Sequence, residues 1–119
     1  MLEIIYYTDS RGRQPVYEWI QHTKKHEPAN FRKMYQLQVM LHENGKLIQS
    51  GEIKRKDIKK LKGTEMWQLR VNDHRILFFY YQGNAIVFTN TFIKKQNETP
   101  QSEIDRAETR KNHFLNKPL

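Results

Sequence analysis

The stretch of sequence that decides the fold spans residues 58–100: it begins with IKKLKG at residues 58–63, continues with MWQLRVNDHRILFFYY at 66–81 and AIVFTNTFIKK at 85–95, and ends with TP at 99–100. Apolar residues alternate with others along residues 67–71 and 76–80, a period of two that is typical of half-buried strands. Turn residues at 71–74 and at 82–84 divide this stretch into three strand-like runs, at 67–71, 76–80 and 85–95. The stretch therefore predicts a meander of antiparallel strands, with one apolar face covered and an open face that carries cations.

The segments before this meander predict one strand and two helices. The run LEIIYYT at residues 2–8 is apolar, β-branched and aromatic, as expected of a first strand. Pro15 suits the first turn of a helix that extends to about residue 25. A second helix is expected from about residue 29 to residue 43, and Gly45 would end it in the left-handed conformation of a helix cap.

After the meander, Thr99 as N-cap and Pro100 at the first position predict a last helix. Its apolar stripe is thin, which predicts a loosely docked helix, and residues 115–119 are expected to form a frayed tail. The predicted fold is α+β: a small, mainly antiparallel sheet packed on helices, in the order strand, helix, helix, three strands, helix. With 119 residues and no linker or repeat, the chain is expected to form a single domain over residues 1–119.

Charge is the strongest signal in the composition. Lys and Arg number 21 against 13 Asp and Glu, and the net charge of +8 suits a nucleic acid or an acidic protein as partner. The chain has no cysteine, which excludes a disulfide framework and a thiolate zinc site. No apolar run approaches a membrane span, and the first residues lack a signal-peptide pattern. We therefore expect a soluble, cytoplasmic protein without a membrane partner.

Cations cluster in residues 54–62, before the first strand-like run. The candidates for contact with RNA phosphates are Lys54, Arg55, Lys56, Lys59, Lys60 and Lys62. Clustered cations displace counterions from an RNA backbone and so add salt-dependent affinity. The simpler alternative is a solvated loop, because charge runs often have no ligand.

Two arginines on either side of the turn at residues 71–74 are more specific candidates. The guanidinium groups of Arg70 and Arg75 can each hold a phosphate through two hydrogen bonds, and they stay charged at neutral pH. Beside a scissile phosphate they would stabilise the additional negative charge of the transition state. The alternative is a structural role in salt bridges with Glu65 or Asp73.

Three residues near the arginines complete the candidate set. Lys94 and Lys95 end the last strand, and alternation sends them to opposite faces. Counting back to Phe88 and Phe92 places Lys94 on the face of these two residues, so Lys94 is selected for the site and Lys95 as an outer RNA contact. His74 lies in the turn, where an imidazole could donate or accept a proton, although an ordinary turn residue is the alternative.

Other kinds of site are not expected. His22 and His26 are four residues apart, but no third ligand is evident, so neither a metal nor a cofactor is predicted. The chain also contains no Gly-rich phosphate loop, no nucleophile elbow and no paired-carboxylate pattern.

Four segments, taken in order, carry a resemblance to a known family: TDSRGRQPVYEWI, IKKLKG, MWQLRVNDHRILFFYY and FIKKQNETPQSEIDRAETR. This order resembles the RelE/HigB superfamily of bacterial type II toxins, in its phage-derived Gp49-like or HigB-like branch. The resemblance implies a RelE-like fold and an endoribonuclease, an mRNA interferase that inhibits translation by cutting mRNA on the ribosome. It also implies a helix-turn-helix antitoxin as partner. The implied reaction is attack of the RNA's own 2′-hydroxyl on the adjacent phosphate, which needs no metal.

The resemblance also assigns residues. The family's strand arginine after the turn corresponds to Arg75, the arginine of its L-R motif to Arg70, and its basic residue near the end of the last strand to Lys94 or Lys95. These three positions form the catalytic set that the resemblance implies. His74, chosen for its place in the turn, is added as a proton-transfer candidate.

Two departures from the RelE type leave the general base open. Met66 and Gln68 stand where RelE-type toxins carry lysines, and Ile104 is the nearest match to a tyrosine that stacks on a base. Lys62 or His74 could act as the base, although neither has a family assignment. The alternatives are a non-catalytic member of the fold that binds RNA or a regulatory protein, and a phage protein that keeps the scaffold for assembly or host control.

Overall fold

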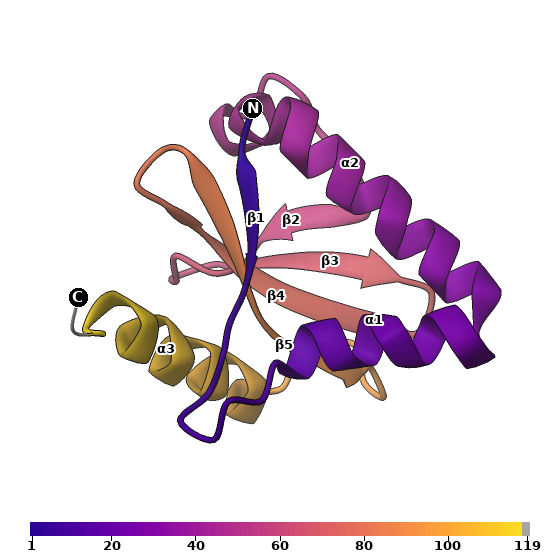
Figure 1. Ribbon diagram of the computed structural model, residues 1–119. Helices are drawn as coiled ribbons and strands as arrows, with labels where there is room; N and C mark the ends of the chain where they lie inside the picture. The colour runs from indigo at the N-terminus through magenta and orange to yellow at the C-terminus, as the bar shows by residue number, and fades with distance from the viewer. Residues whose placement is uncertain (118–119) are drawn as a thin grey trace.

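A computed structural model describes residues 1–117 and shows helices on both sides of one sheet (Figure 1). The elements in chain order are β1 (Glu3–Tyr6), α1 (Pro15–His26), α2 (Pro28–Ser50), β2 (Ile58–Lys60), β3 (Trp67–Val71), β4 (His74–Tyr81), β5 (Ala85–Ile93) and α3 (Gln101–Leu115). This order contains one strand more than predicted after the helices, because residues 58–60 form the short β2. None of the helices in residues 1–117 is long and apolar enough to cross a membrane.

The sheet has five strands in the order β1-β5-β4-β3-β2. β1 runs parallel to β5, and the other neighbouring pairs are antiparallel. The prediction of an α+β fold with a small, mainly antiparallel sheet is therefore confirmed. β2 is an edge strand, so the basic segment that contains it borders the sheet on one side.

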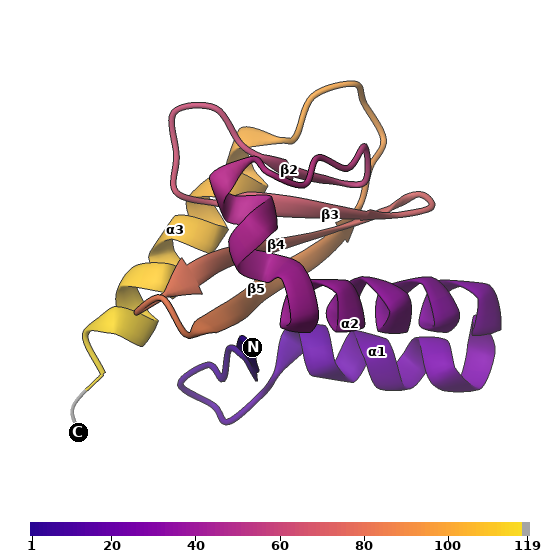
Figure 2. The same ribbon diagram turned by 90° about the horizontal axis from the view of Figure 1, so that it is seen from above.

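Helices cover both faces of the sheet, which differs from the open face predicted from alternation. α1 and α2 lie on one face and α3 on the other (Figure 2). Ile76 and Phe78 of β4 belong to the core under α1 and α2, whereas Leu77 and Phe79 belong to a second core under α3. The run HRILFFYY is apolar on both faces because β4 is buried on both sides. α3 packs over β4 and β5, and the cations gather beside it, over β2 and β3.

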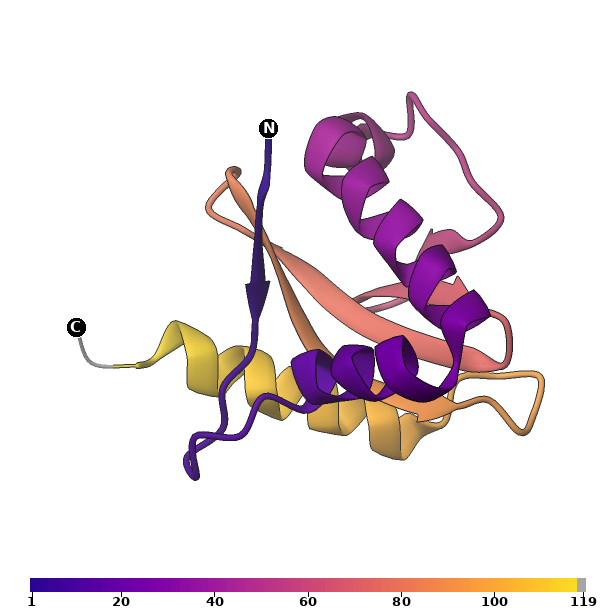
Figure 3. The same cartoon turned by 45° about the vertical axis from the view of Figure 1, so that its right-hand side comes forward.

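α2 continues through Gly45 to Ser50, so the predicted helix end at Gly45 is wrong. Gly45 is buried where α2 meets the N-terminal segment, and a Cβ at this position would collide with Leu2 Cδ1. The Tyr80 hydroxyl also donates to the Gly45 carbonyl at 2.8 Å. The helix instead ends at Gly51, whose φ of 86° is left-handed, and the chain then returns toward β2 (Figure 3).

β5 contains a bulge that reverses the facing of its second half. Phe78 pairs with Phe88 but Leu77 pairs with Asn90, so the residue between Phe88 and Asn90 is extra. As a result Phe88 packs under α1 and α2, while Phe92 packs in the core under α3. The expectation that these two phenylalanines share a face is therefore wrong. The position of Lys94 follows Phe92, and its side chain lines a hollow on the α3 side.

α3 is docked by more contacts than its thin apolar stripe predicts. Ala107 is fully buried in the second core. Arg110 donates from Nη1 to the carbonyl of Thr89, the bulge residue, at 2.8 Å. The helix extends to Leu115, and residues 118–119 of the expected frayed tail lie outside the described residues.

Candidate functional site

The register of the β3–β4 hairpin places Arg70 and Arg75 side by side. They are direct cross-strand partners, and the side chains of direct partners point to the same face of a sheet. Gln68 and Leu77 are the next pair on this face, and Leu77 belongs to the core under α3. Both arginines therefore lie on the α3 face, at the turn end of the hairpin.

Two adjoining hollows open around these arginines. The larger has a volume of about 700 Å³ and is lined by Lys33, Lys54, Arg55, Lys56, Asp57, Arg70, Asn72 and Arg75. The smaller has a volume of about 60 Å³ and is lined by Lys56, Asp57, Lys59, Gln68, Arg70, Arg75 and Lys94. Because four residues line both, we treat them as one site and call it the basic hollow.

Arg75 is a buried cation with a fixed side chain. It is 7% exposed, and its Nη1 donates to the carbonyl oxygens of Asn72 and His74, each at 2.8 Å. Asn72 has a left-handed φ of 55°, which shapes the turn that supplies these carbonyls. Burial, and then the neighbouring charge of Arg70, lowers the pKa of the Arg75 guanidinium. Arginine nevertheless stays charged at neutral pH, so the hollow contains a fixed positive charge.

Neither arginine has an acidic partner, which sets aside the salt-bridge alternative. Among residues 1–117, Glu65 pairs with Lys111 and Asp73 pairs with His74. No acid of this part of the chain lies within 4.0 Å of Arg70 or Arg75. Like charges directly opposite each other destabilise a strand pair. Two arginines held side by side without an acid are suited to binding an anion.

Asp57 organises the loop that forms one wall of the basic hollow. Its carboxylate accepts from Lys33 at 2.7 Å and from Arg55 at 2.9 and 3.0 Å. Its backbone carbonyl accepts from the amide of Arg70 at 2.8 Å. Burial raises the pKa of the Asp57 carboxyl, but the hydrogen bonds from Arg55 and Lys33 outweigh this effect and lower the pKa to about 2. Asp57 therefore stays ionised and connects α2, the loop and β3.

Lys94 completes the cationic lining of the smaller hollow. Its backbone amide donates to the Asp73 carbonyl at 2.8 Å, which anchors the end of β5 to the β3–β4 turn. Desolvation, and then the charges of Arg75, Lys59 and Arg70, lower the pKa of the Lys94 ammonium. Lys94 is thus a better proton donor than an isolated lysine.

The family described as "Phage derived protein Gp49-like (DUF891)" matches residues 30–112. The chain belongs to the Gp49-like family. The resemblance noted in the sequence is thereby confirmed for its Gp49-like branch, and the match includes the whole basic hollow. No curated protein matches this Gp49-like chain in sequence.

Solved structures of YoeB from Staphylococcus aureus share the fold of the Gp49-like chain. A YoeB–YefM complex matches with a TM-score of 0.56 and 18% identity, covering 80% of this chain and 99% of the YoeB chain. A YoeB dimer matches with a TM-score of 0.57 and 19% identity, covering 81% and 98%. At these identities the likeness concerns the fold.

The basic hollow brings together only part of the cation cluster predicted from the sequence. Lys54, Arg55, Lys56 and Lys59 line it. Lys60 pairs with Trp67 in the β2–β3 ladder and lines a separate hollow with Trp67 and Tyr80. Lys62 lies in the exposed β2–β3 connection, and Lys95 is exposed without lining the basic hollow.

His74 is separated from the arginines, although it lies between them in sequence. It pairs with Val71 and Ile93, so it faces α1, and its ring packs on Trp19 with 5.0 Å between centroids. Its Nδ1 lies 3.0 Å from Asp73 Oδ1. Strand alternation accounts for this placement, since His74 and Arg75 are successive residues of β4. The structure thus gives His74 a packing position on the opposite face from the basic hollow.

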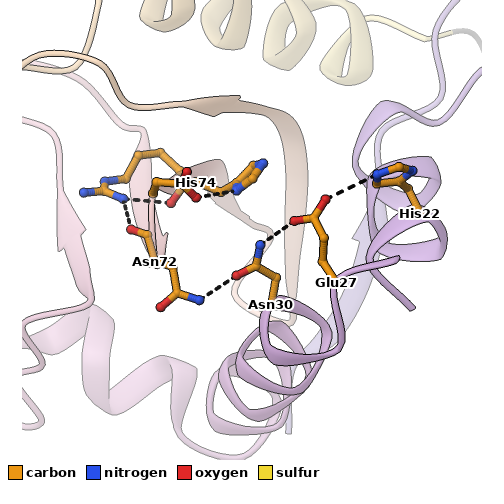
Figure 4. A network of polar contacts seen from close by, with 7 residues as sticks. His22, Glu27, Asn30, Asn72 and His74 are labelled. Carbon is orange, nitrogen blue, oxygen red and sulfur yellow. Dashed lines mark hydrogen bonds and ion pairs between the residues drawn. The ribbon is translucent and has the colours of Figure 1, made fainter. Parts of the chain in front are cut away.

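Polar contacts tie the β3–β4 turn to the junction of α1 and α2 (Figure 4). Asn72 Nδ2 donates to Asn30 Oδ1 at 2.5 Å, and Asn30 Nδ2 donates to Glu27 Oε1 at 2.5 Å. Glu27 in turn lies 3.3 Å from His22 of α1. Because the Asn72 carbonyl holds Arg75, these contacts connect the guanidinium to both helices. The sequence did not predict the roles of Asn30 and Asn72, or the contacts of Asp57 with Lys33 and Arg55. For Asp57 a signal was available, because it is the one acid in the cationic run at residues 54–62.

The two positions that depart from the RelE type differ in location. Met66 is fully buried in the core under α3, whereas Gln68 is buried but lines the smaller hollow. The Thr99 hydroxyl donates to Gln68 Oε1 at 2.7 Å, so Thr99 does not cap α3 as predicted; Pro100 precedes the helix as its N-cap residue. Within residues 1–117, no three His, Asp or Glu side chains gather so as to hold a metal ion.

Proposed function

We propose that this Gp49-like protein is the toxin of a type II toxin–antitoxin system and that it cleaves mRNA, most effectively on the ribosome in the cytoplasm. The observation that carries the proposal is the arginine pair Arg70 and Arg75, which has no acidic partner among residues 1–117 and lies in a hollow lined by further cations. Such a hollow suits the charged backbone of a single RNA strand.

The proposed reaction is transesterification within the RNA. The 2′-oxygen of one ribose bonds to the adjacent phosphorus while the bond from phosphorus to the next 5′-oxygen breaks, which gives a 2′,3′-cyclic phosphate and a 5′-hydroxyl. Because the nucleophile is already tethered, the protein has to align it, stabilise charge and move protons. No metal takes part in this reaction.

Each residue of the basic hollow has a proposed part in this step. Arg75 and Arg70 stabilise the negative charge that builds up on the phosphate oxygens. Lys94, whose pKa is lowered by desolvation and by Arg75, Lys59 and Arg70, protonates the departing 5′-oxygen. The 2′-hydroxyl proton passes to water, because Asp57 is engaged by Lys33 and Arg55 and His74 faces away.

The RNA strand on either side of the scissile phosphate is proposed to contact the walls of the basic hollow. Lys54, Lys56 and Lys59 are the proposed phosphate contacts, with Arg55 held in place by Asp57. Lys60, Lys62 and Lys95, which were candidates on sequence grounds, lie outside the hollow and are left out of the proposal.

A helix-turn-helix antitoxin is the proposed protein partner. Two of the solved structures with this fold are YoeB–YefM complexes, one described as a heterotetrameric toxin–antitoxin complex from Staphylococcus aureus. A chain with a net charge of +8 favours an acidic partner that covers its cationic surface. Co-purification with the product of the neighbouring gene tests this part, and a monodisperse protein with no affinity for that product would contradict it.

A second candidate function is RNA binding without cleavage. Met66 and Gln68 supply no cation where RelE-type toxins carry lysines, and His74 is not beside the arginines. These features leave the hollow without a side chain that is clearly suited to take the 2′-hydroxyl proton. The fold and the cationic lining would serve this function equally well.

Induced expression of the chain alone, followed by mapping of transcript ends, decides between the two functions. We expect growth arrest and new mRNA ends within translated regions. With purified protein and ribosomes, we expect cleavage of an RNA but not of its 2′-deoxy counterpart. Arrested growth with unchanged transcript ends would reject the nuclease and leave the RNA-binding function.

A further inference from the structure

Gln68 is an almost fully buried polar residue in the wall of the basic hollow. It is 4% exposed and lies in β3, next to Arg70 on the same face and opposite Lys59 of β2. Its amide oxygen is already used, because the Thr99 hydroxyl donates to it at 2.7 Å. The orientation of the amide is thereby set by a residue that lies outside the sheet.

The amide nitrogen of Gln68 is the part that remains available. Within residues 1–117, Nε2 has no hydrogen-bond partner. It is not one of the solvent-inaccessible side-chain atoms that lack a partner, so it keeps some accessible surface. The Gln68 side chain as a whole is nearly buried, and buried polar side chains normally have hydrogen-bond partners. Since Gln68 lines the smaller hollow, its two N–H bonds are available to whatever occupies that space.

The lining of the smaller hollow points to an oxyanion. Gln68 shares it with Lys59, Arg70, Arg75 and Lys94, all of which are donors. The carboxylate of Asp57, its one acid, already accepts from Lys33 and Arg55. A volume of about 60 Å³ suits a single group such as one phosphate rather than a base.

We propose that Gln68 is a substrate-contacting residue whose Nε2 donates to a phosphate oxygen of the bound RNA, and that Thr99 is the positioning residue that fixes its amide. This inference rests on the proposed RNA-binding function. A neutral donor adds a hydrogen bond without adding to the repulsion between Arg70 and Arg75. Gln68 would thus supply a hydrogen bond without a charge, at a position where RelE-type toxins carry a lysine.

The same segment that carries Thr99 also begins with Lys94. Lys94 follows directly on β5, and Thr99 lies just before α3, so one connection supplies a cation to the hollow and orients its neutral donor. The backbone bond from Lys94 to Asp73 fixes the first end of this connection. The Thr99–Gln68 bond fixes the second end.

Gln68→Met tests the donor, because methionine has a similar length and no N–H group. Gln36→Met, at an exposed position of α2, is the matched control. We expect a single-turnover cleavage rate lower by on the order of 10²-fold for Gln68→Met, as for loss of one donor to a developing oxyanion. Melting temperature reports whether the variant is folded, and the control should retain the wild-type rate.

Salt dependence separates a neutral donor from a cation. Binding of a 2′-deoxy oligonucleotide, which cannot be cleaved, is measured for Gln68→Met and for Lys59→Met at several salt concentrations. Both variants should bind more weakly. The slope of log K against log salt should stay at its wild-type value for Gln68→Met and become shallower by about 0.7 for Lys59→Met.

Two further variants test the orientation of the amide. Thr99→Val should slow cleavage by about tenfold, since the donor is misplaced rather than removed, and Thr99→Ser should restore the rate. Gln68→Glu, which presents an acceptor to the phosphate, should be less active than Gln68→Met. Gln68→Glu or Gln68→Met with wild-type binding and cleavage would overturn the inference alone. A wild-type protein that binds no oligonucleotide would overturn the proposed function together with it.

Discussion

Arg75 combines a structural and a chemical role in one side chain. Its Nη1 holds two carbonyls of the β3–β4 turn, and the rest of the guanidinium borders the basic hollow. Arg75→Ala should cost about 1–3 kcal/mol of folding free energy through the lost hydrogen bonds. It should also slow cleavage by on the order of 10²–10³-fold through the lost charge. Urea unfolding and single-turnover cleavage measure the two effects separately.

Arg75→Lys and Arg32→Ala make this prediction decisive. Lysine keeps the charge but lacks the planar fork, so its rate should fall between those of wild type and Arg75→Ala. Arg32 is exposed on α2 and outside the hollow, and its removal should change neither property. A folded and fully active Arg75→Ala protein would remove Arg75 from the site.

Asp57 should make the folding stability of the protein depend on pH. The carboxyl has a pKa of about 2 in the folded protein against 3.8 as its ordinary value, because Arg55 and Lys33 overcome the effect of burial. A lowered folded-state pKa contributes stability above the ordinary value, which is lost as the pH falls from about 4 toward 2. Asp57→Asn should therefore be less stable than wild type at pH 7, and the difference should shrink below pH 4.

Melting temperatures between pH 7 and pH 2.5 check the Asp57 prediction. Glu52→Gln, at an exposed position of the preceding loop, is the control and should follow the wild-type curve. A difference in melting temperature between Asp57→Asn and wild type that stays constant across this range would contradict the prediction. It would show that the contacts of the Asp57 carboxylate do not contribute to acid sensitivity.

At the scale of elements, β2 places successive lysines on opposite faces. Lys59 pairs with Gln68 and lines the basic hollow, whereas Lys60 pairs with Trp67 and lines a different one. Lys59→Ala should weaken RNA binding, and Lys60→Ala, which removes the same charge from the adjacent residue, should not. Fluorescence anisotropy with a 2′-deoxy oligonucleotide measures both. Equal losses of affinity in the two variants would mean that the total charge of the segment decides binding, and not the face on which each lysine lies.

α2 contains a second test, at Gly45. A Cβ there would collide with Leu2 Cδ1 in a well-packed region, so Gly45→Ala should destabilise the fold by about 1–3 kcal/mol despite alanine's higher helix propensity. Lys46→Ala, at the next and exposed position, should be nearly neutral. Urea unfolding compares the two. An unchanged midpoint for Gly45→Ala would mean that the N-terminal segment is not packed on α2.

The types of most elements could be predicted from local pattern, whereas their ends depended on packing. The strands predicted along residues 67–71 and 76–80 are confirmed, because the apolar alternation and the turn residues indicate the same elements. Gly45 has the chemistry of a helix end, but its actual role is close contact with Leu2, which no local pattern reveals. Three residues of β2 are too few to produce a periodic signal.

The candidate site was predictable where strand register decides it. Arg70 and Arg75 are brought together by the hairpin turn, and that turn is visible in the sequence. His74 lies between them in sequence, which predicts nearness in space, yet strand alternation turns its side chain toward α1. Asn30 and Thr99 reach the site from distant segments, so only the tertiary structure identifies them.

At the scale of the whole molecule, net charge alone should not determine RNA affinity. Lys24 and Lys56 each contribute one positive charge. Lys24 is exposed on α1, whereas Lys56 lines the basic hollow. Lys56→Ala should make the slope of log K against log salt shallower by about 0.7, and Lys24→Ala should leave it unchanged. Titrations of the same oligonucleotide at several salt concentrations measure the slope. Similar changes for both variants would indicate diffuse attraction without a defined groove.

The bulge in β5 has a consequence for comparing this chain with its relatives. Even-numbered residues such as Phe88 face α1 and α2 before Thr89, and even-numbered residues such as Phe92 face α3 after it. A relative with an unbulged strand would be one residue shorter here and could still point its terminal cation into the same hollow. An alignment of the two chains then needs a one-residue gap at Thr89. Without this gap, the relative's counterpart of Lys94 would be matched to Ile93, and a shared functional residue would be recorded as lost.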